Sequence, residues 1–95
     1  MRIVNKKAID DFKRSHADAV KALDAWVSDV EGAQWSTPNQ LKERYPRASI
    51  LKAGHAVFDI VGNKYRLWVQ ITYKNDVLYV KRIGTHKEYD GWEIR

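Results

Sequence analysis

The chain has 95 residues and a mass of 11.1 kDa, and 44% of its residues are hydrophobic and 31% charged, a globular composition that fits one domain (residues 1–95) and excludes a second. Its formal net charge of +5 and isoelectric point near 9.6 favour an acidic partner, such as nucleic acid or an acidic protein. The longest apolar run, residues 77–80, is far shorter than the roughly 20 residues of a membrane helix, and no signal-peptide core is found, so we expect no membrane partner.

The sequence contains no cysteine, which excludes a disulfide framework, a thiolate metal site and a cysteine nucleophile. A chain without cysteine fits the reducing cytoplasm as its default compartment, and we expect a cytoplasmic protein. Stability must then come from packing, so most of the eleven aromatic side chains are expected in the core.

The first third of the chain predicts a brief strand followed by helices. Residues 1–4 form the strand, and Asn5 is suited to cap a helix that carries Ile9 and Phe12 on one face. Ser15 and the aspartate three residues later have the spacing of a capping box, which predicts either a second helix or a bend in the first.

The helical part of the chain continues to Pro46, where the hydrophobic period changes, and a short third helix is its last element. Thr37 before Pro38, with Gln40 at the third helical position, begins a short helix that Pro46 stops. The helix before it ends near Gly32 and is predicted by apolar residues at helical spacing: Val20, Leu23, Trp26 or Val27, and Val30.

After these helices, alternating apolar residues predict strands. Residues 50–51 and 55–61 form two of them, and the Gly62-Asn63 dipeptide predicts a two-residue hairpin turn, because a primed turn needs positive φ angles that these residue types tolerate. The turn sets the hairpin register and places three pairs opposite one another: Ile60 with Tyr65, Asp59 with Arg66, and Phe58 with Leu67.

Residues 64–73 alternate cleanly and form the second strand of this hairpin. Asn75-Asp76 is predicted to turn the chain into a last strand, residues 77–83, that ends at Gly84. A two-residue loop at this turn predicts two pairs across the strands: Lys81 with Gln70 and Tyr79 with Thr72.

The predicted fold class is α+β, with the N-terminal helices packed on one face of a curved, mostly antiparallel sheet of four to five strands. The helices cover the side chains of Tyr65, Leu67, Val69, Ile71 and Tyr73. The other face is expected to be open and close to His86 and Tyr89 if the tail folds back, and to display Lys64, Arg66, Trp68, Gln70, Tyr79 and Lys81.

The positive charge is concentrated in residues 64–87, whose local sum of +5 equals the excess of the whole chain. The alternative is that dispersed lysines only keep the surface soluble. This segment has one acidic residue, Asp76, and six basic ones: Lys64, Arg66, Lys74, Lys81, Arg82 and Lys87.

Several classes of site are not supported by the motifs. The three histidines lie 39 and 31 residues apart without metal-ligand spacing, so we expect no metal, and the scattered glycines form no phosphate loop, so we expect no nucleotide cofactor. The serines lie in the helical half or just after it, away from His86, which leaves serine-hydrolase chemistry unsupported.

An open face with cations, an aromatic platform and proton-transfer groups suits metal-free RNA cleavage, in which the 2′-hydroxyl attacks the neighbouring phosphate. Arg66 and Lys81 would stabilise the transition-state charge. His86 has an ordinary pKa of about 6.5, near neutrality, and Tyr89, with one of about 10, is a weaker acid candidate.

Each candidate also has a structural interpretation. Arg66 can pair with Asp59 across the hairpin, Trp68 can be core beneath the tail, and His86 after Thr85 can cap a terminal turn. Lysines 64, 74 and 87 are of a type that is usually solvated, and we expect the remaining histidines at the surface: His16 and His55.

The motifs Gly-Asn-Lys-Tyr-Arg-Leu at residues 62–67 and Gly-Thr-His-Lys-Glu-Tyr-Asp at residues 84–90 resemble the HigB family of toxins from bacterial type II toxin–antitoxin modules. The likeness covers nearly the whole chain and includes Arg2-Ile3, Ala25-Trp26 and residues 35–41. It implies a RelE-superfamily fold and a ribosome-dependent mRNA endonuclease, neutralised by a HigA-type antitoxin that carries a helix-turn-helix domain.

The resemblance implies site residues within both motifs: Lys64 and Arg66 in the first, and His86, Glu88, Tyr89 and Asp90 in the second. Relatives tend to have an apolar residue after a single basic one in the last strand, so either Lys81 or Arg82 faces the site, and the alternation favours Lys81. Glu88 and Asp90 are expected to be structural, because negative charge opposes phosphate binding.

We therefore expect a metal-independent mRNA interferase with catalytic Arg66, Lys81, His86 and Tyr89, in which His86 or Tyr89 moves protons. The alternatives are a ParE-like toxin that binds a protein such as gyrase, and a non-catalytic RNA-binding module. The antitoxin is expected either on the basic face or on the helices. Further RNA-binding residues are Lys64, Trp68, Lys74, Arg82 and Lys87.

Overall fold

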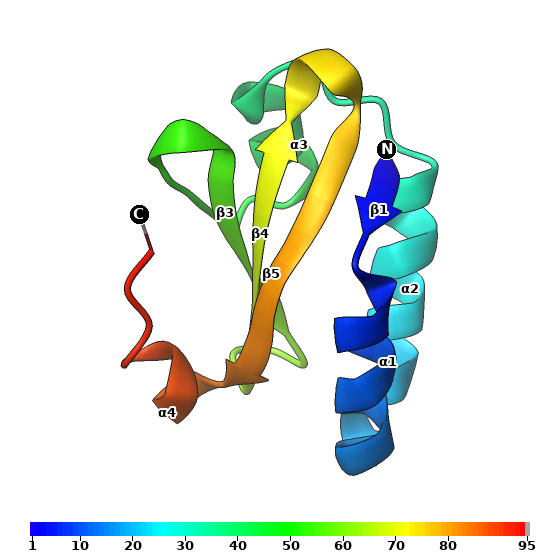
Figure 1. Cartoon of the computed structure of the whole chain (residues 1–95), viewed down its shortest axis with the longest axis vertical. Helices are drawn as coiled ribbons and strands as arrows, with labels where there is room; N and C mark the ends of the chain where they lie inside the picture. Colours follow the sequence, from blue (N-terminus) through cyan, green and yellow to red (C-terminus); the bar gives the residue numbers. More distant parts are fainter. Residues whose placement is uncertain (95) are drawn as a thin grey trace.

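A computed structural model describes residues 1–94 and confirms the predicted α+β class (Figure 1). None of the helices in this part of the chain is long and apolar enough to cross a bilayer. The elements are, in chain order, β1 (Arg2–Val4), α1 (Lys6–Ser15), η1 (Ala17–Ala19), α2 (Val20–Glu31), α3 (Pro38–Arg44), β2 (Ser49–Ile50), η2 (Lys52–Gly54), β3 (His55–Ile60), β4 (Tyr65–Thr72), η3 (Tyr73–Asn75), β5 (Val77–Thr85) and α4 (His86–Tyr89).

The five strands form one sheet in the order β1-β5-β4-β3-β2, in which β1 is parallel to β5 and the other neighbours are antiparallel. Helices α1 and α2 lie on one side of the sheet, while α4 and the tail that follows it lie on the other (Figure 1). The sheet therefore has an inner face toward α1 and α2 and an outer face toward α4.

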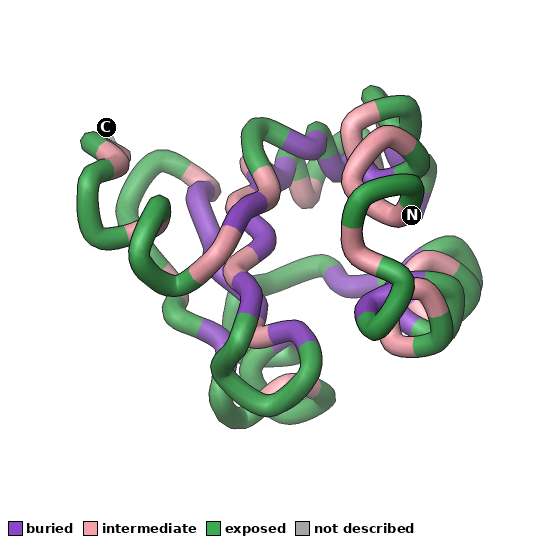
Figure 2. Tube along the Cα trace, turned by 90° about the horizontal axis from the view of Figure 1, so that it is seen from below, coloured by how far each residue is buried: buried purple, intermediate pink, exposed green. Residues whose placement is uncertain are grey.

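The core lies between the inner face and the helices. Figure 2 shows buried positions along the central strands, and β4 alternates between buried and less buried residues over its whole length. The predicted inward set is confirmed, since Tyr65, Leu67, Val69 and Ile71 are buried, with Tyr73 half-buried in η3. They pack against apolar side chains of the helices, including Ile9, Leu23, Trp26, Val30 and Leu41.

The helices that follow Asn5 and Ser15 form, and Asn5 occupies the predicted N-cap position, but neither residue makes a side-chain capping hydrogen bond. Asn5 stands at the N-cap of α1 in the left-handed region (φ 71°), but its amide donates to the Val80 carbonyl (2.9 Å). Ser15 is the last residue of α1, and α2 is preceded by η1 without a side-chain cap. The Asp18 carboxylate instead accepts hydrogen bonds from Tyr65 (2.7 Å) and Lys64 on the sheet. The side chains of Asn5 and Asp18 thus make long-range contacts, which the local spacing of residues does not reveal.

The predicted end of α2 and the predicted start of α3 are confirmed. Gly32 is the C-cap of α2, and the Thr37 hydroxyl accepts a hydrogen bond from the Gln40 N–H (3.4 Å) at the start of α3. Pro38 occupies the first turn, and the helix ends at Arg44, two residues before Pro46. These ends depend on neighbouring residues and therefore follow the local rules.

The register of the β3–β4 hairpin is confirmed: Ile60 pairs with Tyr65, Asp59 with Arg66, and Phe58 with Leu67. The Lys64 N–H donates to the Val61 carbonyl (3.1 Å), which closes the turn around Gly62-Asn63. The predicted turn conformation is wrong, because positive φ angles occur at Val61 (54°) and Gly62 (66°) and not at Asn63. The strands also end at Ile60 and begin at Tyr65, one residue farther from the turn on each side than predicted.

The predicted register of β4 and β5 is wrong. Tyr79 pairs with Gln70, and Thr72 pairs with Val77, because four residues connect the strands through η3 rather than two. Beyond this point a register shift between Trp68 and Val69 leaves Lys81 without a partner, so Arg82 lies opposite Trp68. Such a β-bulge adds one residue and changes which side chains share a face. The strand also continues past Gly84 to Thr85.

Candidate functional site

The outer face of the sheet carries several of the residues for which chemistry was predicted. Residues directly opposite one another on neighbouring strands project from the same face. Three rows cross this face: Asp59, Arg66 and Gly84; Val57, Trp68 and Arg82; and His55, Gln70 and Tyr79.

Arg66 is fixed at the hairpin end of the outer face. Its Nε lies 3.3 Å from Asp59 Oδ1, so the predicted ion pair across the hairpin is present, and its Nη1 donates to the Asn63 carbonyl (2.7 Å). The guanidinium carbon lies 5.4 Å from the centre of the Tyr89 ring. With only 12% of its side chain exposed, Arg66 is held in one orientation beside α4.

His86 and Tyr89 lie one turn apart on α4, and their rings are stacked with centroids 6.4 Å apart and planes 22° apart. His86 is exposed, whereas Tyr89 is half-buried between His86 and Arg66. The His86 N–H donates to the Lys64 carbonyl (3.1 Å), which ties the start of α4 to the hairpin. The structure therefore brings Arg66, Tyr89 and His86 side by side, and we call these three residues the site row.

A capping box holds α4 in this place. The Thr85 N–H donates to Glu88 Oε1 (2.8 Å), and the Thr85 hydroxyl accepts from the Glu88 N–H (3.1 Å). These hydrogen bonds from Thr85 lower the pKa of the Glu88 carboxyl below its ordinary range. Glu88 thus has the structural role expected for it, and the cap residue is Thr85 rather than His86.

Trp68 is half-buried in the centre of the outer face, where its Nε1–H donates to Nδ1 of His55 (3.0 Å). The expectation that His55 is a surface residue is wrong, because only 4% of it is exposed. His16 is also half-buried and stacks on Phe12 (3.8 Å). His55 is covered by Trp68 from the next strand, and His16 is covered by Phe12, one helical turn away.

Lys81 and Arg82 are both exposed, but the bulge separates their surroundings. Arg82 is the direct neighbour of Trp68 and is diagonal to Arg66 across the strands, where Cα atoms are usually about 7–8 Å apart. The Lys81 ammonium lies 5.2 Å from the centre of the Tyr79 ring, in the direction away from α4. Of the two cations that the sequence offered, Arg82 therefore lies nearer to Trp68 and Arg66, and Lys81 lies beside Tyr79.

The other three lysines that were predicted to bind RNA lie in different surroundings: Lys64, Lys74 and Lys87. Lys64 is not on the outer face as expected: its ammonium pairs with Asp18, beside the inner-face residue Tyr65, and this contact lowers the pKa of the Asp18 carboxyl. Lys74 is exposed in η3, at the other end of β4 from α4. Lys87 is exposed on α4 itself, and it is the one of the three that lies beside the site row.

Sequence reasoning missed Trp92, which the tail places on the outer face. Its ring lies 6.2 Å from the Trp68 ring and 5.7 Å from the Tyr89 ring, and the Arg82 guanidinium lies 5.5 Å from it. The signal in the sequence is a tryptophan shortly after a motif of charged and polar residues, which no periodic pattern assigns to a strand or a helix.

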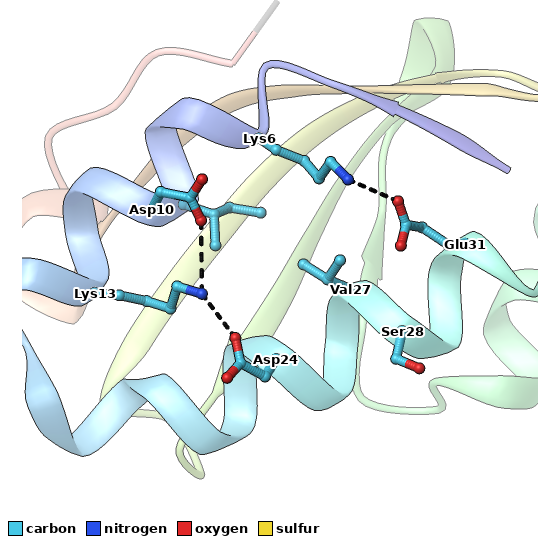
Figure 3. A pocket seen from close by; sticks show the side chains of 8 residues that line it. Lys6, Asp10, Lys13, Asp24, Val27, Ser28 and Glu31 are labelled. Atoms are coloured by element: carbon cyan, nitrogen blue, oxygen red, sulfur yellow. Dashed lines mark hydrogen bonds and ion pairs between the residues drawn. The ribbon is translucent and has the colours of Figure 1, made fainter.

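A hollow of about 320 Å³ lies between α1 and α2, on the other side of the sheet from this site (Figure 3). Its charged side chains are paired with one another: Lys6 with Glu31 (2.9 Å), and Lys13 with Asp24 (2.7 Å) and Asp10 (3.5 Å). Such a self-neutralised lining has little charge left for a phosphate. Among residues 1–94, no three His, Asp or Glu side chains are grouped to hold a metal ion.

Comparisons with known proteins identify the family to which this chain belongs. Residues 19–92 match the family described as HigB_toxin, RelE-like toxic component of a toxin-antitoxin system. The mRNA interferase HigB of Escherichia coli O6:H1 (strain CFT073) is 27% identical over 92 residues, which are 95% of this chain and 89% of that protein. The mRNA interferase toxin HigB of Escherichia coli strain K12 is 26% identical over 92 residues, 95% and 88% of the two chains. The chain belongs to the HigB family, the RelE-like toxic components of toxin–antitoxin systems.

Proposed function

We propose that this toxin is a ribosome-dependent mRNA endonuclease that cleaves translated mRNA by metal-independent attack of the 2′-hydroxyl. The observation that carries the proposal is the row of Arg66, Tyr89 and His86, in which a cation, a phenol and an imidazole lie side by side. The similar proteins that bear the name mRNA interferase support the same substrate class.

In the proposed reaction the 2′-oxygen forms a bond to the neighbouring phosphorus, the bond from phosphorus to the 5′-oxygen breaks, and a 2′,3′-cyclic phosphate results. A base takes the 2′-hydroxyl proton and an acid protonates the departing 5′-oxygen. Arg66 holds the phosphate, and Arg82 adds positive charge from the neighbouring strand. His86 or Tyr89 moves the protons, since their rings adjoin each other and Arg66.

The proposed partners are mRNA in the ribosome and a HigA-type antitoxin with a helix-turn-helix domain. An antitoxin is implied by membership of a toxin–antitoxin family. An acidic partner segment would be attracted to the excess of positive charge, and its binding would weaken with rising salt if it covers the outer face.

The test is expression of the wild type and of Arg66→Ala and His86→Ala variants, followed by primer extension on cellular mRNA. We expect new 5′ ends with the wild type and their loss with both variants. Lys21→Ala is the matched control, because this exposed lysine of α2 lies on the helical side of the sheet, away from the outer face, and the variant should cleave like the wild type.

A second experiment compares programmed ribosomes with naked RNA, each with and without a chelator. Cleavage only on ribosomes and unaffected by the chelator is expected. Growth arrest without new 5′ ends would overturn the nuclease proposal and favour a toxin that binds a protein target.

A further inference from the structure

Trp92 lies in the tail beyond α4, on the opposite side of the sheet from the main core. It is only partly exposed, because three side chains of the outer face surround it: Trp68, Tyr89 and Arg82. Its ring plane is tilted by 34° from that of Trp68 and by 86° from that of Tyr89. The two indoles therefore adjoin each other without stacking face to face.

Gly84 provides the space for this position of Trp92. A Cβ atom at Gly84 would lie 2.9 Å from Cζ2 of Trp92 and 3.0 Å from Oε1 of Glu88, closer than such contacts normally are. The backbone at Gly84 has no positive φ, so its conformation does not explain a glycine there. The close approach of the Trp92 ring to β5 explains it.

Trp68, which adjoins Trp92, is held in a fixed orientation. Its Nε1–H donates to Nδ1 of His55, and β3 keeps His55 buried. Proteins stack the unpaired bases of single-stranded RNA on aromatic rings and on the planes of arginine guanidinium groups. Here the arginine is Arg82, whose guanidinium lies over the Trp92 ring.

We propose that Trp92, with Arg82, forms a stacking site for one unpaired nucleobase of the RNA substrate. The inference rests on the proposed function for the identity of the substrate and adds a subsite to it. Tyr89 contacts both Arg66 and Trp92, so the stacked base belongs to a nucleotide next to the phosphate that Arg66 holds.

The test uses the full chain and a short single-stranded RNA whose 2′-hydroxyls are all methylated, so that binding is measured without cleavage. A matched oligonucleotide has abasic positions in place of its bases. We expect Trp92→Ala to bind the methylated RNA about tenfold more weakly than the wild type, since one stacked base contributes a factor of this order. Trp92→Phe keeps an aromatic face and should retain most of the affinity.

Two further results are expected. Gly84→Ala should weaken binding as Trp92→Ala does, because the added methyl group displaces the indole from β5. The abasic oligonucleotide should bind wild type and Trp92→Ala equally, since it has no base to stack. Thermal unfolding of each variant identifies any loss of affinity that is caused by unfolding.

Equal affinity of the wild type for the normal and abasic oligonucleotides would overturn the inference without any variant. Wild-type affinity of a folded Trp92→Ala variant would also overturn it, and so would the absence of measurable RNA binding. If the methylated RNA binds as expected but cellular mRNA is not cleaved, the proposed nuclease fails while the stacking site stands. If cellular mRNA is cleaved and Trp92→Ala has no effect on RNA binding, the stacking site fails while the proposed nuclease stands.

Discussion

The guanidinium carbon of Arg66 lies 5.4 Å from the centre of the Tyr89 ring, and this contact joins β4, just after the hairpin turn, to α4. The two residues are 23 positions apart in the sequence. Arg66 is also paired with Asp59, so one cation links β3, β4 and α4. A single substitution at this point should therefore change both the charge and the geometry of the site.

Arg66→Ala should lower the rate of mRNA cleavage about a hundredfold or more, the usual effect of removing one preorganised donor to a transition-state oxygen. Arg66→Lys should lose most of the activity as well, because an ammonium cannot reproduce the planar contacts to Asp59 and Tyr89. Cleavage by programmed ribosomes with purified variants measures both effects.

Asp59→Asn is the control for orientation, because it keeps Arg66 but removes its charged partner. We expect a smaller loss of activity than for Arg66→Ala and a decrease of about 1 kcal/mol or less in the free energy of unfolding. Full activity of Arg66→Ala, with unchanged thermal stability, would contradict the role of Arg66.

Arg82→Ala should reduce cleavage more than Lys81→Ala. The reason is the bulge in β5, which places Arg82 opposite Trp68 and directs Lys81 toward Tyr79. The dependence of RNA affinity on salt concentration gives a second measurement: loss of one phosphate contact to a single strand lowers the logarithmic slope by about 0.7. We expect this decrease for Arg82→Ala only.

The two variants are matched in net charge, since each loses one positive charge. A difference between them therefore reflects the position of the lost cation. A larger loss for Lys81→Ala, in rate or in slope, would show that the bulge does not determine which cation acts.

Thr85→Ala should destabilise α4 by about 1 kcal/mol, the typical cost of losing an N-cap side chain, and lower activity because His86 and Tyr89 both lie on α4. Thermal unfolding measures the loss of stability, and cleavage by programmed ribosomes measures the loss of activity. Lys87→Ala, on the same helix but outside the capping box, should leave α4 in place.

The capping box also predicts a dependence on pH. The pKa of Glu88 is lower in the folded protein than its ordinary value of about 4.3, so its contribution to stability is complete above that value. The contribution is lost as the pH falls through the lowered pKa. The wild type should therefore release α4 in acid, whereas Glu88→Gln should lack this transition. An identical acid transition in Glu88→Gln would exclude the carboxyl as its source.

The sequence alone predicted those features that depend on neighbouring residues. The alternation of residues 64–73 gave the buried side of β4, and the Gly62-Asn63 turn gave the β3–β4 register, because a short turn fixes which residues face one another. Thr37, Pro38 and Gly32 marked helix ends for the same local reason. The motifs at residues 62–67 and 84–90 were sufficient to indicate the family.

Only the tertiary structure decided which side chains meet on the outer face. Asp18 accepts hydrogen bonds from Lys64 and Tyr65 instead of capping a helix, and His55 is buried beside Trp68. The longer connection changed the partner of Tyr79, and the bulge placed Arg82, rather than Lys81, next to the row of Trp68.

Trp92 gives the clearest example of this difference. No periodic pattern in the sequence assigns a position to a residue of the tail. The Trp92 indole can lie against β5 because Gly84 has no side chain there. Local sequence determines the period of a strand and the ends of a helix, since a few adjacent residues control backbone angles and hydrogen bonds. The site is composed of contacts between residues that are distant in the sequence, and those form only when the whole chain packs.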